Sequence, residues 1–251
     1  MLFRSQSQHL ACGQCAGQRG AVQLAWRSPN AEVLGLGINP ASPQRGNLSG
    51  AASTNDDPWP ARLLVFGMLG VALGAFQWSA SPWFVATKQA VAEWLVRREI
   101  WWALDTPGQW WLFTHYPEVN DAFTWLDGSL LLAYIAVQAL VLGVWMRVFL
   151  GLAAGCARLP WTRVAMTLIP LGGISVFVGL SQLTTTQLAG EGIVLPWAAP
   201  ARFTLLLATL WAVALAWRLP GGGWRGVRTA VAVALAATLP LLAWHQQFFV
   251  W

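Results

Sequence analysis

Five long apolar stretches limit what this 251-residue chain can fold into. They contain no aspartate, glutamate or lysine, and they cover residues 61–80, 129–154, 164–183, 202–217 and 229–244. A helix of about 20 apolar residues, rising about 1.5 Å per residue, is long enough to cross the hydrocarbon core of a bilayer. We therefore predict a transmembrane helix in each stretch.

The composition excludes an ordinary soluble domain. Apolar residues make up 56% of the chain and charged residues 10%, whereas soluble domains have about 45–50% and about 25%. So few charges cannot cover a surface that faces water. We expect an all-α integral membrane helical bundle with about five transmembrane helices plus an interfacial helix, and the lipid bilayer as its partner.

The two ends of the chain differ in composition. Residues 1–60 are dominated by glycine, serine, glutamine, asparagine and proline, which predicts a mostly disordered N-terminal extension. This extension does not look like a signal peptide, because Arg4 interrupts its start and no apolar run precedes a cleavage site. Residues 61–251 form the predicted transmembrane helical domain.

The segment 81–128 breaks the apolar pattern of this domain. Charged side chains are interspersed along 85–102, where they would be costly in lipid, so we predict an amphipathic helix in the interface plane. Tryptophan suits this layer because its ring is apolar and its N–H is polar. Seven tryptophans lie in the segment: Trp83, Trp94, Trp101, Trp102, Trp110, Trp111 and Trp125.

Several residues indicate how the spans are shaped. Gly70 and Gly74, with Gly67 one turn earlier, permit close helix packing. Pro170 and Pro240 predict kinks in the third and fifth spans.

The second span is expected to be capped at Asp127 or Ser129. The third span is polar in its later half, where side chains can bond a neighbouring helix or line a path. These side chains are Ser175, Ser181, Gln182, Thr184, Thr185 and Thr186.

The charges predict the orientation of the chain. Two loops are flanked by arginines alone, and such loops face the cytoplasm; the arginines are Arg147, Arg158 and Arg163, and Arg218, Arg225 and Arg228. Six acids gather in 81–128, which is expected to face outward. We predict a multi-pass protein of the bacterial inner membrane with a cytoplasmic N-terminus and a periplasmic C-terminus. The scattered bases do not indicate a nucleic-acid partner.

A Cys-x-x-Cys pair, Cys12 and Cys15, is the metal-type motif of the chain. Two thiolates at this spacing can hold one side of a zinc or iron–sulfur site. The pair is half a site, since Gln18 stands where a ferredoxin run has its next cysteine. His9 and Cys156 are further candidate ligands, and an idle thiol pair in the extension is the alternative.

Other candidate chemistry is sparse. His115 stands near Glu118, Asp121 and Asp127, which suits either a quinone or proton site or an ordinary interfacial turn. His245 lies just past the fifth span without a second histidine facing it, which disfavours a bis-histidine haem. No P-loop, zinc-protease motif, nucleophile elbow or dinucleotide fingerprint is found. We assign no catalytic residue and expect that the chain is not an enzyme.

Three stretches together carry a family resemblance: residues 73–91, 110–135 and 169–192. They resemble the C-terminal membrane part of bacterial membrane-bound 4Fe-4S polyferredoxins, the group with the NosR- and NapH-type electron-transfer proteins, over about 60–250. In that family, cysteine-rich ferredoxin modules outside the spans carry the clusters. Here only Cys12 and Cys15 match part of such a motif, so the ligand set for an iron–sulfur cluster is incomplete.

The resemblance implies an anchor or accessory component of an iron–sulfur electron-transfer system. A ferredoxin-type or other redox membrane subunit is the implied partner. Two alternatives come from other classes: a small membrane transport or assembly-helper protein that uses the polar third span, and a truncated, inactive remnant of a longer protein.

Overall fold

The computed structural model describes residues 29–34, 58–106, 115–116 and 121–250. The chain divides into two units, 1–38 and 39–251. Of the first unit the structure describes one short helix, α2 (Pro29–Leu34). Most of the predicted extension 1–60 lies outside the described residues. All that follows concerns the second unit.

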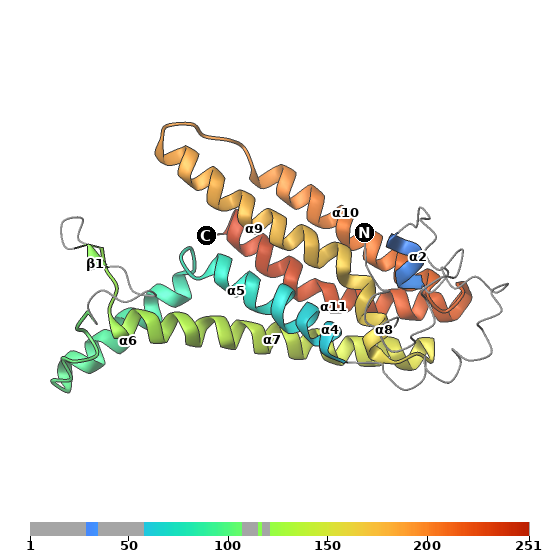
Figure 1. Ribbon diagram of the computed structural model, residues 1–251, viewed down its shortest axis with the longest axis horizontal. Coiled ribbons are helices and arrows are strands. Elements are labelled where there is room, and N and C mark those ends of the chain that lie inside the picture. The colour runs from blue at the N-terminus through green and yellow to red at the C-terminus, as the bar shows by residue number, and fades with distance from the viewer. Residues whose placement is uncertain (1–28, 35–57, 107–114, 117–120, 251) are drawn as a thin grey trace, which may run out of the picture. The chain divides into compact units, whose positions relative to one another are not determined.

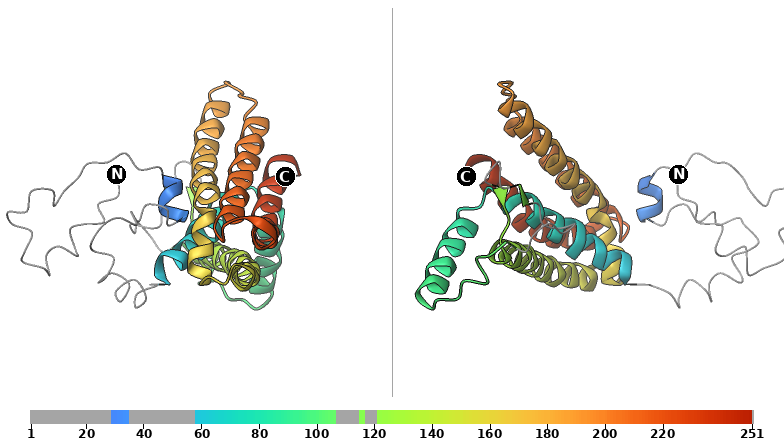
Figure 2. Two further views of the ribbon diagram at one scale, coloured as in Figure 1. Left: turned by 90° about the vertical axis from the view of Figure 1, so that its right-hand side faces the viewer. Right: turned by 60° about the vertical axis from the view of Figure 1, so that its left-hand side comes forward.

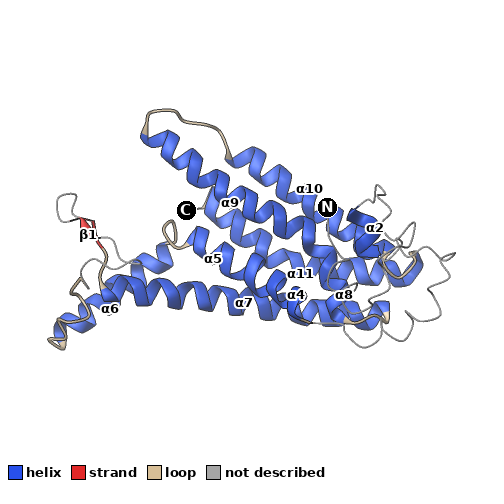
Figure 3. Ribbon diagram, viewed as in Figure 1, coloured by secondary structure: helices blue, strands red, loops and turns tan. Residues whose placement is uncertain are grey.

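Five helical segments of the second unit are long and apolar enough to cross a membrane: Trp59–Gln77, Trp125–Ala157, Trp161–Gly190, Ala198–Arg218 and Gly223–Phe249. Each contains most or all of one predicted span. The prediction of an all-α membrane bundle with five spans is therefore confirmed (Figures 1 and 3). The chain is a multi-pass helical membrane protein.

Two spans are built from several pieces. The first consists of α4 (Trp59–Arg62), the π-helical η1 (Leu63–Val71) and α5 (Ala72–Gln77). The third consists of α8 (Trp161–Ala165), the 3-10 turn η3 (Met166–Leu168) and α9 (Ile169–Gly190). The other three are the single helices α7 (Trp125–Ala157), α10 (Ala198–Arg218) and α11 (Gly223–Phe249).

The remaining elements belong to the segment between the first two spans. Helix α6 (Pro82–Arg97) follows α5 directly. Two short strands, β1 (His115–Tyr116) and β2 (Asp121–Ala122), then pair antiparallel, with His115 opposite Ala122.

The five spans pack as a closed ring in the order η1–α5, α7, α11, α10, α9 (Figure 2). Its interior is filled by apolar side chains from all five spans, among them the fully buried Leu69, Met146, Leu171, Ala212 and Val233. Large apolar side chains also cover the outside, as on α7, where Leu132, Val137, Leu140, Val144 and Val148 are exposed. An outward apolar surface of this extent is what lipid requires.

The charges sort to the two ends of the ring. One end, called here the arginine end, carries Arg62, Arg147, Arg158, Arg163, Arg218, Arg225 and Arg228. The opposite end, called the α6 end, holds α6, the α9–α10 connection and the last turn of α11 (Figure 1). Within the described part of 58–251, every acidic residue lies at the α6 end: Glu93, Glu99, Asp105, Asp121, Asp127 and Glu191.

The start of α7 differs from the prediction. The N-cap is Thr124, not Asp127 or Ser129, so the helix begins earlier than its apolar run. The Thr124 Oγ1 accepts from the Asp127 backbone N–H at 3.2 Å, and the Asp127 Oδ2 accepts from the Thr124 N–H at 3.2 Å. This reciprocal capping box satisfies two backbone donors that the first turn otherwise leaves unbonded.

The two prolines behave differently. In the third span the break is the 3-10 turn η3, and Pro170 stands just after it in the first turn of α9, where a missing N–H costs little. Helix α11 continues through Pro240 without interruption. One turn before Pro240, the carbonyl of Leu235 accepts from Trp145 Nε1 at 3.0 Å. This indole bond ties α7 to α11 near the position where the proline weakens the helix ladder.

Glycines set how closely the first span approaches its neighbours. A Cβ on Gly70 would lie 2.9 Å from the Ala139 Cα, and one on Gly74 would lie 3.2 Å from the Ile135 Cα. The predicted close packing at these two glycines is confirmed, whereas Gly67 faces open space. Two phenylalanines of the same span also lie against glycines, Phe66 against Gly143 of α7 and Phe76 against Gly179 of α9.

Candidate functional site

A buried glutamine joins three helices near the α6 end. Gln77, the last residue of α5, is fully buried. Its Nε2 donates to the carbonyl of Ala243 on α11 at 2.7 Å, and its Oε1 accepts from Gln138 Nε2 on α7 at 3.0 Å. The bond to Ala243 occupies a backbone carbonyl within the ring, and the bond to Gln138 joins two amides.

A second buried glutamine joins α9 to the same group of helices. Gln247 on α11 is 6% exposed. Its Nε2 donates to Gln182 Oε1 on α9 at 2.6 Å and to the carbonyl of Phe76 on α5 at 3.2 Å. Deeper between α9 and α11, Trp244 Nε1 donates to Ser175 Oγ at 3.3 Å. We call Gln77, Gln138, Gln182, Gln247, Ser175 and Trp244 the amide network.

The amide network bears on the two roles considered for the polar half of the third span. Ser175 and Gln182 bond α11, and Thr184, Thr185 and Thr186 donate to carbonyls of their own helix. These contacts favour helix joining over a lined path. The Oε1 of Gln247 has no hydrogen-bond partner among the described residues, so one acceptor of the network is open.

Four members of the network were not singled out in the sequence: Gln77, Gln138, Gln247 and Trp244. Gln77 and Gln138 lie inside predicted spans, and a polar side chain within an apolar run is the pattern that identifies them. Gln247 lies past the predicted end of the fifth span at 244, but α11 extends to Phe249. Each interhelical bond of this kind contributes about 0.6–2 kcal/mol in a membrane.

A second feature of this end is the way α6 is attached to the bundle. The Ser81 Oγ caps its first turn by accepting from the Phe84 N–H. The Phe84 ring packs edge-on against Tyr134 of α7, with centroids 5.8 Å apart. One turn along α6, Lys88 Nζ lies 2.5 Å from Asp127 Oδ1, and the Asp127 side chain is only 11% exposed.

The far half of α6 has a small apolar core of its own. Leu95, Ala103 and Leu126 are buried together, and Val91, Ala92, Ile100, Leu104 and Leu130 pack against them. The backbone N–H of Leu126 also donates to the carbonyl of Ala103 at 2.9 Å. Residues 98–106 therefore fold back onto the start of α7 and hold α6 from its other end.

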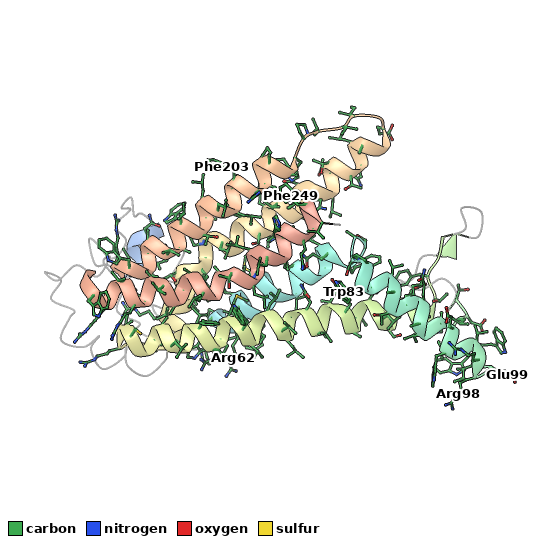
Figure 4. All side chains as sticks on the ribbon, turned by 180° about the vertical axis from the view of Figure 1, so that it is seen from behind. Arg62, Trp83, Arg98, Glu99, Phe203 and Phe249 are labelled. Carbon is green, nitrogen blue, oxygen red and sulfur yellow. The ribbon has the colours of Figure 1, made fainter. Side chains whose placement is uncertain are left out.

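The outer face of α6 and the turn after it carries tryptophans. Trp83, Trp94, Trp101 and Trp102 are 49–73% exposed. We call these four residues the tryptophan face; Trp83, Arg98 and Glu99 mark its extent in Figure 4. The predicted helix over 85–102 is confirmed with different bounds, because Arg98 caps α6 and Glu99 adopts a left-handed φ of 57°. Its position in the membrane interface stays a prediction.

The predicted metal ligands are not brought together in the described part of the chain. Cys12, Cys15 and His9 lie outside the described residues. Cys156 is on α7, half-buried near the arginine end. Among the residues that the structure describes, no group of three or more His, Cys, Asp or Glu is placed to hold a metal ion.

The two other candidate histidines, His115 and His245, lie in different elements. His115 lies on β1 opposite Ala122, Asp121 lies on β2 opposite Tyr116, and Glu118 lies outside the described residues. His245 stacks on Phe249 at a centroid distance of 5.2 Å and lies at the α6 end, the opposite end of the bundle from Cys156.

No family model, curated protein or solved structure matches this chain. Its class therefore follows from the fold and the site alone. It is a five-span helical membrane protein in which neutral side chains cross-link the spans at one end, and a clamped helix bears a tryptophan face beside them.

Proposed function

We propose that this chain is a membrane anchor that holds a partner at its α6 end, as an accessory component of an iron–sulfur electron-transfer system. The observation that carries the anchoring role is the clamped position of α6. Lys88–Asp127, Phe84–Tyr134 and the core around Leu126 fix the helix to the first turns of α7.

This clamp makes the tryptophan face a preorganised surface. A surface fixed before binding loses less conformational entropy when a partner docks, which favours affinity. Tryptophan supplies a large apolar area with one polar N–H, and it is enriched at the centres of protein interfaces. The amide network joins α7, to which α6 is clamped, to α5.

The electron-transfer role follows from the family resemblance. The three stretches that carry it, 73–91, 110–135 and 169–192, contact one another at the α6 end. Phe84 and Lys88 of the first contact Tyr134 and Asp127 of the second. The third reaches the first through Gln247, which bonds both Gln182 and Phe76. Their assembly into one region supports treating them as a single functional unit.

The residues of the described bundle do not fit an iron–sulfur cluster, because no set of three or more candidate ligands converges there. The proposal therefore assigns the cluster to the partner and gives this chain the anchoring role. Cys12 and Cys15 are the thiols that this chain itself offers, and two thiolates hold one side of such a site.

The test is anaerobic purification from native membranes, followed by iron and acid-labile sulfide analysis and EPR spectroscopy. Wild-type protein is expected to retain a partner that contributes iron, sulfide and an EPR signal. Replacing Trp83 and Trp102 together by alanine is expected to reduce all three at least several-fold. The matched control is Trp224→Ala, since Trp224 is an equally exposed tryptophan at the arginine end (70%).

Two outcomes would overturn parts of the proposal separately. Wild-type protein without iron, sulfide or EPR signal above a mock purification, although a partner is retained, removes the electron-transfer role. Unchanged retention of the partner by the Trp83/Trp102 double variant removes the tryptophan face as the docking surface.

A further inference from the structure

An apolar groove lies between α10 and α11 at the α6 end, and Trp244 of the amide network is one of its lining residues. Its volume is about 320 Å³. Its walls are formed mainly by leucines of the two helices, Leu205 and Leu206 on one side and Leu241 and Leu242 on the other. Leu206 and Leu242 are exposed on the outside of the ring, so the groove opens toward lipid.

The mouth of the groove is basic. Arg202 lies in the second turn of α10, and its guanidinium carbon is 5.3 Å from the centre of the Phe249 ring. His245 stacks on the same ring. Figure 4 labels Phe249 in the last turn of α11 and Phe203, the neighbour of Arg202, on α10.

Among the described residues, no acidic side chain forms an ion pair with Arg202. Within the described ranges, the salt bridges are Lys88–Asp127 and Arg97–Glu93, and Arg202 takes part in neither. Its guanidinium lies over the Phe249 ring instead, and its N–H groups donate to no described residue. A planar guanidinium presents paired donors that match a phosphate group.

The groove is charged at its mouth and apolar along its depth, as a phospholipid is charged at its headgroup and apolar along its acyl chains. Thr238, at its deep end, is seven residues before His245, which corresponds to about 10 Å along the helix axis. The Thr238 hydroxyl is occupied by the carbonyl of Leu235, so the deep end presents apolar surface. A cation therefore stands at the helix ends, where headgroups lie, and an apolar channel runs from it toward the membrane centre.

We infer that this groove binds one anionic phospholipid, with part of an acyl chain between α10 and α11 and the phosphate on Arg202. Charge complementarity selects an anionic lipid over a zwitterionic one, because the zwitterionic headgroup brings its own cation to the phosphate. Phe249 holds the guanidinium at the mouth, and the leucines recognise the chain by apolar contact. This inference does not depend on the proposed electron-transfer role.

Native mass spectrometry of detergent-purified protein tests it. The protein is exchanged into detergent containing equal amounts of phosphatidylglycerol and phosphatidylcholine of the same acyl chains. We expect one phosphatidylglycerol retained in preference to phosphatidylcholine. The Arg202→Gln variant should lose this preference by about fivefold, the effect of removing one basic residue near an anionic membrane surface. The matched control, Arg97→Gln at the same end of the bundle, should retain it.

A second variant tests the groove itself. Leu206→Trp fills the apolar channel while keeping Arg202, so it should lose the bound lipid, and its helicity by circular dichroism reports that the bundle is intact. Inorganic phosphate at millimolar concentration should not displace the lipid, because it lacks the chain. Equal retention of both lipids by wild type, unchanged selectivity in Arg202→Gln, or displacement by inorganic phosphate would each overturn the inference.

Discussion

The Nε2 of Gln247 lies 2.6 Å from the Oε1 of Gln182, so α11 and α9 are joined by an amide–amide hydrogen bond in an otherwise apolar surrounding. In the sequence these two residues are 65 positions apart. The same nitrogen also bonds the carbonyl of Phe76, so one side chain connects three spans. Loss of this side chain therefore affects several helix contacts at once.

Gln247→Leu is expected to lower the free energy of unfolding by about 1–3 kcal/mol, since it removes two hydrogen bonds and leaves buried acceptors unsatisfied. Unfolding in mixed micelles, followed by circular dichroism, measures this change. The control is Gln246→Leu, because Gln246 is the exposed neighbour on the same helix. Equal stability of the two variants would contradict the cross-linking role of the amide network.

Gly143→Ala is expected to destabilise the bundle by about 1–3 kcal/mol, because the added methyl group would overlap the Phe66 ring. The comparison is Gly155→Ala on the same helix, where a Cβ meets no atom within 4 Å. That control should be neutral or slightly stabilising, since alanine favours helix more than glycine does. Thermal unfolding of the purified variants distinguishes them, and similar Tm values would argue against tight packing of η1 on α7.

Lys88→Gln is expected to loosen α6 from the start of α7. The ion pair with Asp127 is partly screened, because Lys88 is 45% exposed, so its loss should cost about 1 kcal/mol or less. Hydrogen exchange of the α6 amides should then be up to about fivefold faster.

Arg97→Gln is the control for this measurement. It removes the Arg97–Glu93 pair, in which both side chains are at least 70% exposed, and should leave exchange unchanged. Equally fast exchange in both variants would mean that the Lys88–Asp127 pair does not clamp α6.

Reporter fusions test the predicted orientation. A fusion after Ala51 and another after Trp251 should report opposite sides of the membrane, because five spans separate the two positions. The arginine end is expected on the cytoplasmic side, in accord with its seven arginines. Both reporters on one side would overturn the five-span topology.

The number and places of the spans were predictable because an apolar run alone decides whether a helix is stable in lipid. The ends were less predictable. The apolar run begins at Ser129, which suggested that α7 starts there. The capping pair Thr124 and Asp127 instead begins the helix at Trp125. Likewise, the polar residues after 244 concealed that α11 continues far enough to place Gln247 in the ring.

The hydrogen-bond partners within the amide network could not be predicted from the sequence, for a different reason. Ser175 and Gln182 were identifiable as polar residues in a span, but their partners on α11 depend on which helices become neighbours. The closed ring, with α11 between α7 and α10, sets those neighbours. The π-helical geometry of Leu63–Val71 also has no separate pattern in an apolar run. The candidate thiol pair Cys12 and Cys15 remains a prediction.

The amide network consists of amide, indole and hydroxyl groups bonded to one another and to backbone carbonyls. None of these groups gains or loses a proton near neutral pH, so folding changes no proton binding at these positions. The cohesion that they give to the spans is consequently uncoupled from acidification on either side of the membrane. A proton gradient can build across the bilayer while the joint at the α6 end holds with constant strength.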